Sequence, residues 1–332
     1  MTALTIVTSK AINTVRIFRP RRNFTARNFS LSHSRKMKFV QFSYKNKPDE
    51  IRVGYIEPNN TDCFVDINQA SGDLPSTLLG LLQNDCIGQV KTLQQAGPKN
   101  EKLTDVNIRA PITGIDKVLC IGLNYKDHCQ EQNLTPPAVP MMFSKFPSCL
   151  IGQSEPLKIR CNVTQKVDWE AELVVVIGKK ASFVQASDAH KYIFGYTIAQ
   201  DISARDWQKE KNAGQFVLGK AMDGFCPLGP WIVTADELDP NKLDIACSIN
   251  GKTKQSSNTK NLIHKIPDVI ERLTSVMTLL PGDIILTGTP GGVGVHRQPP
   301  EFLAPGDVIV TEIQHIGALT TRVVDYADCA DQ

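Results

Sequence analysis

The sequence lacks the features that mark membrane-spanning, disulfide-linked and zinc-binding chains. It has no run of about 18 apolar residues, so we expect no membrane-spanning helix. Its nine cysteines are odd in number, irregularly spaced and free of any Cys-x-x-Cys pair, which argues against a disulfide framework and against a zinc site. Cysteine use of this kind fits a reducing compartment, such as the cytosol or the mitochondrial matrix.

Acidic residues are absent from the first 48 positions, whereas basic residues are frequent there. Residues 1–36 are also rich in serine and threonine and contain no continuous apolar stretch, which is typical of a mitochondrial transit peptide rather than a secretory signal. A basic arm that binds nucleic acid is the competing interpretation. Because the rest of the chain is acidic, we favour a transit peptide, expect it to be disordered, and expect no nucleic-acid partner.

Length and composition indicate a globular protein with one small and one large unit. The chain has 332 residues, of which 41% are hydrophobic and 21% are charged. Residues 37–107 are predicted to form a small β-rich N-terminal domain, because Met37–Tyr44 and Ile51–Ile56 alternate apolar and polar residues as strands do. Residues 111–326 are predicted to form the larger, catalytic domain.

Local patterns predict several elements of the larger unit. Lys117–Gly122 reads as a strand, and a short helix is expected over 124–131. The following loop contains four prolines between 136 and 147, and loops of this length within a domain are often lids. Ile193–Ala199 reads as another strand, and the apolar spacing of Leu262–Leu280 predicts a long amphipathic helix.

The most informative stretch is Val167–Gly178, which reads as one strand that begins polar and ends apolar. Alternation along a strand would place Asp168, Glu170 and Glu172 on one side, with the Cα atoms of the two glutamates about 7 Å apart. Such charges are tolerated if solvent separates them, if one is protonated, or if a cation lies between them. An exposed acidic strand end is the alternative.

Asp201 follows the strand predicted at 193–199 and could complete a three-carboxylate site for a hard cation, with positions left for water and substrate. Arg205 and Gln208 would share one face of the next helical turn. There the guanidinium could hold a substrate carboxylate through two parallel hydrogen bonds. An ordinary helix surface is the alternative for this pair.

Two further features suggest proton chemistry and charge binding. His128 and Glu131 are three residues apart, so a helix would bring them together. A neighbouring carboxylate raises the pKa of an imidazole and fixes its tautomer, as general acid–base catalysis requires, although a surface histidine is the alternative. Lys220 lies in an apolar stretch and must pair with an anion, lose its proton or extend to solvent.

The glycine-rich segment Thr287–Gly294 is not followed by a helical pattern, so we reject a dinucleotide-binding loop. We expect a turn whose backbone and Thr289 hydroxyl approach a small ligand. Gly251–Thr253 matches the end of a phosphate-binding P-loop, but Ala246 occupies the position of the required glycine, so this motif is also rejected.

Taken together, the motifs of this chain resemble those of the fumarylacetoacetate hydrolase superfamily. In chain order they are Gly122-Leu-Asn-Tyr-Lys-Asp-His128, Trp169-Glu-Ala-Glu-Leu173, Gln200-Asp-Ile-Ser-Ala-Arg-Asp206, Leu218-Gly-Lys220, Cys226-Pro227 and Leu286-Thr-Gly-Thr-Pro290. They span roughly 117–324 in the family's order, so the match is specific. The resemblance implies an α+β fold that is predominantly β, a C-terminal-type β-sandwich or roll with a small N-terminal domain.

The resemblance also implies roles for individual residues. Three carboxylates would bind a divalent metal, Mg²⁺ or alternatively Mn²⁺: Glu170, Glu172 and Asp201. Three residues would be catalytic, the first two as an acid–base pair on a lid: His128, Glu131 and Lys220. Four residues would contact the substrate: Arg205, Gln208, Thr289 and Tyr125. Asp168 is not a family ligand position and is expected to be solvated or to lie behind the ligands.

Within the family, the basic leader and the small N-terminal unit are most similar to a mitochondrial branch associated with keto–enol tautomerisation of oxaloacetate. The resemblance therefore implies a homodimeric isomerase of the mitochondrial matrix that acts on a small 2-oxo dicarboxylic acid. A metal that chelates such a substrate stabilises its enolate, and Lys220 and Arg205 would hold the remaining carboxylate. An acylpyruvate hydrolase or oxaloacetate decarboxylase is the alternative, and a non-enzymatic dimeric binding protein is a third.

Overall fold

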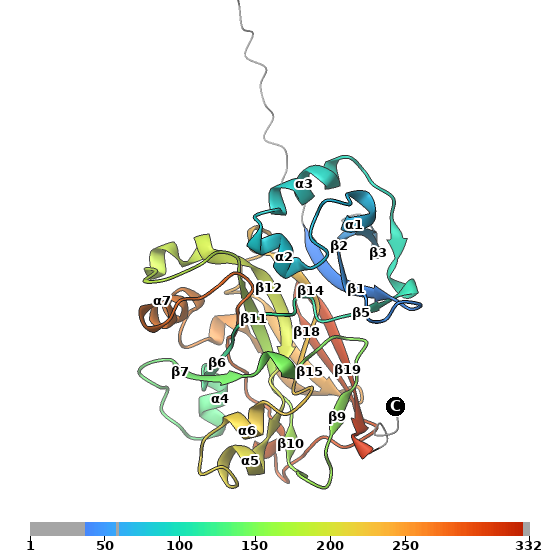
Figure 1. The fold of residues 1–332 in the computed structure, drawn as a ribbon. Coiled ribbons are helices and arrows are strands. Elements are labelled where there is room, and N and C mark those ends of the chain that lie inside the picture. The colour runs from blue at the N-terminus through green and yellow to red at the C-terminus, as the bar shows by residue number, and fades with distance from the viewer. Residues whose placement is uncertain (1–36, 58–59, 328–332) are drawn as a thin grey trace, which may run out of the picture. The chain divides into compact units, whose positions relative to one another are not determined.

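The computed structural model describes residues 37–57 and 60–327, and Figure 1 shows how their elements are arranged. The predicted transit peptide at 1–36 lies outside the described residues. None of the helices in the described part is both long enough and apolar enough to cross a membrane. The eight cysteines of the described part are all free thiols.

A large mixed sheet of twelve strands carries most of the fold. Its main path runs in the order β4 (Glu101–Lys102), β3 (Asn60–Asp66), β2 (Arg52–Glu57), β1 (Lys38–Tyr44), β14 (Cys226–Thr234), β12 (Ile193–Gln200), β11 (Ala171–Ile177), β17 (Ile284–Leu286), β6 (Val118–Gly122) and β7 (Met141–Lys145). Beside this path, β5 (Val106–Ile108) pairs with β1 and β8 (Leu150–Ile151) pairs with β14.

A second sheet packs against the first. Its five strands follow the order β16 (Lys252–Asn258), β15 (Asp244–Ile249), β18 (Val308–Ile313), β19 (Gly317–Asp325) and β9 (Leu157–Ile159). Two very short strands, β10 (Val167–Asp168) and β13 (Ser203–Ala204), pair separately. The two packed sheets confirm the predicted α+β, predominantly β, sandwich-type fold.

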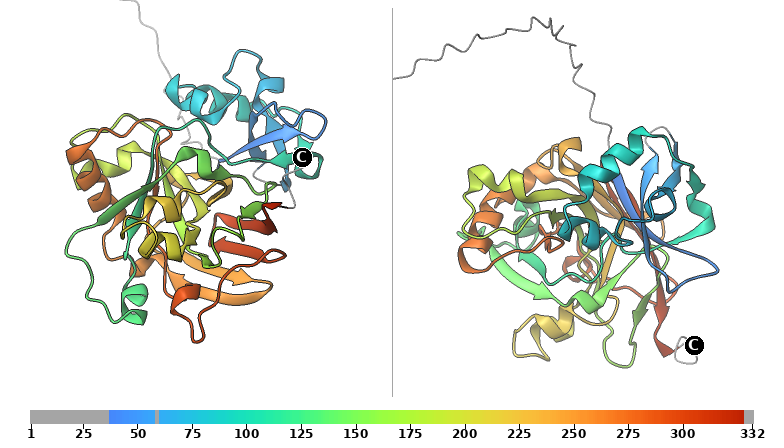
Figure 2. Two further views of the ribbon diagram at one scale, coloured as in Figure 1. Left: turned by 60° about the horizontal axis from the view of Figure 1, so that its bottom comes forward. Right: turned by 45° about the horizontal axis from the view of Figure 1, so that its top comes forward.

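Short helices connect these strands, as the two views of Figure 2 show. The α-helices of the described part are α1 (Ile67–Ala70), α2 (Leu78–Gln83), α3 (Ile87–Gln95), α4 (Lys126–Glu131), α5 (Arg205–Lys209), α6 (Val217–Lys220) and α7 (Ile266–Val276). The 3₁₀ turns are η1 (Leu103–Asp105), η2 (Pro147–Cys149), η3 (Ala186–Tyr192), η4 (Ala235–Glu237), η5 (Thr259–Asn261) and η6 (Gly294–His296).

Strand β11 is apolar along its length because both of its faces are buried. Leu173 and Val175 point into the core shared with the five-stranded sheet. Val174 and Val176 point into a second core, which the N-terminal strands and helices complete. A strand buried on both faces reads as a continuous hydrophobic run rather than an alternating one.

The stretch predicted as one strand, Val167–Gly178, is interrupted at Trp169 and Glu170. The residues before the interruption form β10, which pairs with β13, whereas the residues after it form β11 of the large sheet. The strand pairing therefore changes from the short separate ladder to the large sheet between Asp168 and Ala171.

The N-terminal β-rich segment continues the large sheet. Strand β1 pairs antiparallel with β14, with Phe39 opposite Ile232. The second core likewise takes buried side chains from both sides of the predicted boundary, such as Val53 and Leu228. The sheet thus crosses the boundary that the sequence suggested, and the described residues group as one compact unit.

The sequence predicts one hairpin turn correctly but overestimates the length of the long helix. The Asn250-Gly251 turn joins β15 to β16, and both residues have positive φ, 51° and 75°, as a tight hairpin of this type requires. Helix α7 begins with Pro267 in its first turn and ends at Val276, so it is shorter than the predicted span. The proline-rich loop contains a strand that was not predicted, β7.

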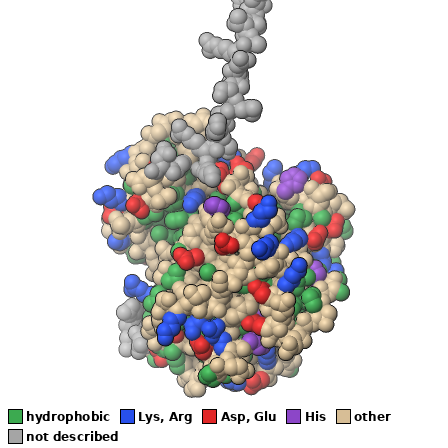
Figure 3. Space-filling model, turned by 180° about the vertical axis from the view of Figure 1, so that it is seen from behind, with side chains coloured by type: hydrophobic (Ala, Val, Ile, Leu, Met, Phe, Trp, Pro, Cys, Tyr) green, Lys and Arg blue, Asp and Glu red, His purple; other side chains and the backbone are tan. Residues whose placement is uncertain are grey.

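Acidic and basic side chains are interspersed on the face of the protein shown in Figure 3. Small groups of hydrophobic side chains lie between them. The charge on this face is therefore mixed in sign.

Candidate active site

Three buried carboxylates meet at one end of strands β11 and β12. Glu170, Glu172 and Asp201 each contribute an oxygen, and these oxygens lie within 4.8 Å of one another. Strand pairing explains the meeting, because Glu172 lies opposite Ala199, and the Asp201 N–H donates to the Glu170 carbonyl at 2.9 Å. The arrangement that the sequence predicts for these three residues is thus present in the structure.

Two buried lysines neutralise part of this acidic cluster. Lys220 Nζ donates to Glu170 Oε2 at 2.9 Å and to Asp201 Oδ2 at 2.7 Å. Lys145, which the sequence analysis did not single out, donates to Asp201 Oδ1 at 2.7 Å and to the carbonyl of Ile202 at 3.0 Å. Both lysines are at most 2% exposed, so they pair with anions and do not extend to solvent.

Arg205 links the carboxylate trio to Asp168. Its Nε donates to Asp168 Oδ2 at 2.9 Å, and its Nη2 lies 2.7 Å from Glu170 Oε1. Its Nη1 donates to Gln208 Oε1 at 3.1 Å, so the two residues share a helix face as predicted. Asp168 is fully buried and also accepts the Gly294 N–H at 2.7 Å. It therefore lies behind the ligand cluster and is not solvated.

Glu172 differs from the other buried carboxylates of the site, which are paired with lysine or arginine. Among the described residues it has no ion-pair partner, and its Oε2 accepts only the Gly288 N–H, at 2.6 Å. Burial raises the pKa of Glu172 well above its ordinary value, and the charges of Asp201 and Glu170 raise it further. Burial also raises the pKa of Glu170, but Lys220 and Arg205 more than offset that effect and leave this pKa below its usual range.

His128 is held in a defined orientation on α4. Its Nδ1 lies 2.6 Å from Glu131 Oε1, and the other oxygen of Glu131 accepts the Gly292 N–H at 2.7 Å. Its Nε2 lies 3.0 Å from the side-chain nitrogen of Gln132, which can only donate. This pattern fits a proton on Nδ1 that is shared with Glu131.

One cavity of about 190 Å³ joins these groups. Seven of the predicted site residues line it: His128, Glu170, Glu172, Arg205, Gln208, Lys220 and Thr289. Glu131 and Asp201 lie directly behind this lining, each bonded to a residue that belongs to it. Tyr125 differs, because its buried side chain does not line the cavity and its hydroxyl has no hydrogen-bond partner among the residues that the structure describes.

The cavity also contains residues that sequence reasoning missed. Gln132, Lys209 and His296 line it, and Lys145 supports it from behind. Lys145 ends a short apolar strand within the proline-rich loop, where an isolated cation gives a weak signal at most. His296 lies two residues after the glycine-rich segment, and its proximity to His128 depends on long-range packing.

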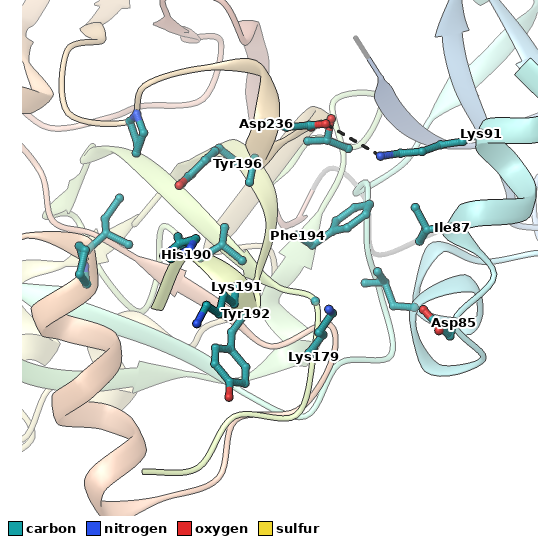
Figure 4. A pocket seen from close by; sticks show the side chains of 18 of the residues that line it. Asp85, Ile87, Lys91, Lys179, His190, Lys191, Tyr192, Phe194, Tyr196 and Asp236 are labelled. Atoms are coloured by element: carbon teal, nitrogen blue, oxygen red, sulfur yellow. Dashed lines mark ion pairs between the residues drawn. The ribbon is translucent and has the colours of Figure 1, made fainter. Parts of the chain in front are cut away.

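A larger cavity of about 730 Å³ lies elsewhere, between the N-terminal helices and the segment that leads into β12. Figure 4 shows its lining, in which Lys91 and Asp236 form an ion pair of 3.9 Å. Lys179, Lys191 and Tyr196 also line this cavity. Among the described residues, the carboxylate trio is the one cluster of metal-binding type, and it belongs to the smaller cavity.

Comparisons with known proteins identify the family of this chain. Residues 117–324 match the family described as Fumarylacetoacetate (FAA) hydrolase C-terminal. The chain is also 43% identical over 304 residues to "Oxaloacetate tautomerase fahd2, mitochondrial" of Xenopus laevis, which covers 90% of this chain and 93% of the relative.

Solved structures of similar sequence share the fold of this chain. The fumarylacetoacetate hydrolase from Exiguobacterium antarcticum is 33% identical, with a TM-score of 0.75 over 87% of this chain and 99% of that chain. The maleylpyruvate hydrolase from Sphingobium sp. SYK-6, solved in complex with manganese(II) ion and pyruvate, is 30% identical, with a TM-score of 0.71 over 87% and 99%. Residues 117–324 match the family model, most of the chain aligns with a relative at 43% identity, and the fold is shared with a solved member. This chain therefore belongs to the fumarylacetoacetate hydrolase family.

Proposed function

We propose that the protein is a divalent-metal-dependent keto–enol tautomerase that converts enol-oxaloacetate to keto-oxaloacetate. The observation that carries this proposal is one small cavity lined by Glu170, Glu172 and His128, with Asp201 and Glu131 bonded to its lining from behind. Relatives named oxaloacetate tautomerase, at 40–43% identity over 90% of this chain, support the choice of reaction.

The residues present fit a divalent metal. Glu170, Glu172 and Asp201 offer hard oxygen ligands, and their number suits Mg²⁺ or Mn²⁺. The buried Glu172 carboxylate has no cationic partner among the described residues, and a metal would supply the missing positive charge. A bound metal would stabilise the negative charge that develops on the C2 oxygen of a 2-oxo acid.

His128 is suited to move the proton. Conversion of the enol to the ketone removes one proton from the enol oxygen and adds one to C3, with no net change. In its protonated form, His128 would deliver a proton from Nε2 to C3, and the proton released from the enol oxygen would restore the charged imidazole. Glu131 orients the ring and stabilises that charge, because it accepts from Nδ1.

The other predicted residues would position the substrate and the ligands. Lys220 orients Glu170 and Asp201, which it bridges. Gln208 lines the cavity beside Arg205, and its amide group could donate to a substrate oxygen. The Thr289 hydroxyl lines the same cavity, where the amide of Gln255 holds it at 2.8 Å.

The direct test follows the decay of enol-oxaloacetate absorbance with purified protein, with and without a chelator. We expect catalysed decay that a chelator abolishes and that Mg²⁺ or Mn²⁺ restores. Glu170→Ala should abolish it and His128→Gln should reduce it at least about 100-fold, the usual contribution of a positioned acid–base group. Unchanged turnover in Glu170→Ala would leave a non-enzymatic binding protein as the better interpretation.

The alternative activities are separated by product analysis. An acylpyruvate hydrolase or an oxaloacetate decarboxylase of the same family would use the same enolate chemistry, and one solved relative is titled a maleylpyruvate hydrolase. Release of pyruvate with CO₂ or with a carboxylic acid would contradict a pure tautomerase.

We also propose that the protein acts in the mitochondrial matrix as a homodimer, after removal of a transit peptide at 1–36. The basic, acid-free composition of the leader and the word "mitochondrial" in the names of the relatives support the location. The dimer rests on the family resemblance. Subcellular fractionation and light scattering of the purified protein would test the two statements separately.

A further inference from the structure

The two cations that the resemblance assigns to the remote carboxylate of the substrate are already paired. Lys220 bridges Glu170 and Asp201 at 2.9 and 2.7 Å. Arg205 binds Asp168, lies 2.7 Å from Glu170, and uses its third nitrogen on Gln208. Neither side chain has an unpaired positive charge to offer to a second carboxylate.

Two other basic residues line the same cavity without an anionic partner. Lys209 is the last residue of α5, and His296 is the last residue of η6. Within the part of the chain that the structure describes, neither side chain makes a hydrogen bond or an ion pair with the protein. Other basic side chains around the cavity are paired: Lys145, Arg205 and Lys220 with acidic residues, and His128 with Glu131.

Electrostatics favours an anion between these two residues. Burial lowers the pKa of Lys209 and the nearby charge of Arg205 lowers it further, whereas the more weakly felt charges of Glu170 and Asp168 oppose this effect. Burial also lowers the pKa of His296; Glu131 opposes this effect, whereas Lys209 adds to it. A carboxylate placed beside them would stabilise the protonated lysine and accept the N–H of the imidazole.

The position of His296 matches the position that a second carboxylate would take. The rings of His128 and His296 are 6.2 Å apart between centroids. If His128 donates to C3 from about 3 Å, a carboxylate attached to C3 would lie close to the His128 ring, and His296 is the neighbouring ring in the lining of the same cavity. Glu170 and Glu172 line the same cavity, where a metal held by the carboxylate trio would bind the 2-oxo end of the substrate.

We propose that Lys209 and His296 bind the carboxylate remote from the metal, and thereby select 2-oxo dicarboxylic acids over 2-oxo monocarboxylic acids. This inference rests on the proposed function, since it concerns the substrate of that reaction. It adds two residues that determine specificity and that none of the sequence motifs contains.

The test compares oxaloacetate with pyruvate, which has the same 2-oxo acid group but no remote carboxylate. In Lys209→Met and His296→Phe we expect KM for oxaloacetate to rise about tenfold or more, the usual effect of losing a hydrogen bond to a charged group. We expect kcat to stay within about twofold, and the inhibition constant of pyruvate to stay unchanged. Lys209→Arg should retain most of the affinity.

Lys179→Met is the matched control, because Lys179 is an exposed lysine that lines the larger cavity and not this one. Its KM should equal that of the unmodified protein. An unchanged KM for oxaloacetate in both test variants would overturn the inference. An equal loss of affinity for oxaloacetate and pyruvate would also overturn it, because that result would indicate a general disturbance of the cavity.

Calorimetric titration of the Mg²⁺-loaded protein with the same two compounds separates this inference from the proposed function. Tighter binding of oxaloacetate than of pyruvate, lost in Lys209→Met, would support the inference even if the protein showed no tautomerase activity. Equal binding of the two compounds by the unmodified protein would contradict the inference, whatever the activity.

Discussion

At the scale of single residues, two glutamates of one short segment have opposite electrostatic surroundings. Glu170 contacts Lys220 and Arg205, and its pKa is lowered, whereas Glu172 contacts a backbone N–H, and its pKa is raised. The sequence predicts that these carboxylates meet, because the family's motifs contain them. It does not predict which cation pairs with which carboxylate, because Lys145, Arg205 and Lys220 come from separate elements.

Glu172→Gln should abolish the stabilisation of the protein by divalent metal. A metal present at about 100 times its dissociation constant adds about 2.7 kcal/mol, which raises Tm by about 4 °C in a chain of this size. The metal-free variant should be at least as stable as the metal-free parent, because the change removes a buried carboxylate without a cationic partner. Thermal unfolding with and without MgCl₂ measures both effects.

The control for this experiment is Glu312→Gln, which changes an exposed glutamate on β18. It should keep the full response to metal. A metal-induced rise in Tm that survives in Glu172→Gln would remove this residue from the set of ligands.

Metal affinity should increase with pH. Because burial and two neighbouring carboxylates raise the pKa of Glu172, the metal-free site keeps a proton above the ordinary glutamate range, and a metal must displace it. Affinity should rise up to tenfold per pH unit below the raised pKa and then level off. Metal titrations between about pH 5 and pH 8 would show this, and a constant affinity over that range would contradict it.

The raised pKa of Glu172 also determines how the stability of the metal-free protein changes with pH. Its unfolded state releases the Glu172 proton at a lower pH than its folded state does. Stability of the metal-free protein should therefore fall as pH rises from the ordinary glutamate pKa to the raised one.

Lys145→Met should destabilise the protein by about 3–5 kcal/mol, because it leaves one oxygen of a buried aspartate without its cation. Both side chains of the Lys145–Asp201 pair are fully buried. Lys191→Met is the control: it removes an ion pair of similar length, 2.6 Å, at an exposed site, and should change stability little. Urea unfolding at neutral pH measures the loss of stability in each variant. Equal losses would contradict the larger effect expected for the buried pair.

At the scale of elements, the site forms where α4 meets the glycine-rich turn. The sequence predicts the helix and the turn, since both have local signals, but not their contact, which links Glu131 to Gly292 across the fold. It also misses the break between β10 and β11 and the strand β7. Those features depend on partners distant in the chain, namely β13 and β6, which pattern analysis does not reveal.

Gly292→Ala should lower turnover as well as stability. Gly292 has φ +103°, and an added Cβ would lie 2.2 Å from the carbonyl oxygen of Lys254, so the turn must move. Its N–H would then lose Glu131, and His128 would lose its fixed orientation. Tautomerase kinetics and thermal unfolding together measure the outcome.

Gly306→Ala provides the matched control, because Gly306 has a similar φ of +96° but open space around the added Cβ. It should cost about 1–2 kcal/mol from backbone strain and leave turnover unchanged. Equal turnover in the two variants would show that the turn does not position Glu131.

At the scale of the whole molecule, the N-terminal segment and the catalytic residues depend on one continuous sheet. We expect residues 108–332 alone to be insoluble or to unfold without cooperativity, because loss of β1 exposes the edge of β14 and opens the second core. Residues 37–332 should unfold in a single transition. A soluble 108–332 fragment with cooperative unfolding would instead support two independent domains, as the composition suggests.

The bridge that Lys220 forms between Glu170 and Asp201 affects the order of folding and metal binding. An internal ammonium already holds two of the three coordinating groups together, so folding need not wait for a metal. A newly synthesised chain can therefore fold first and bind a metal afterwards.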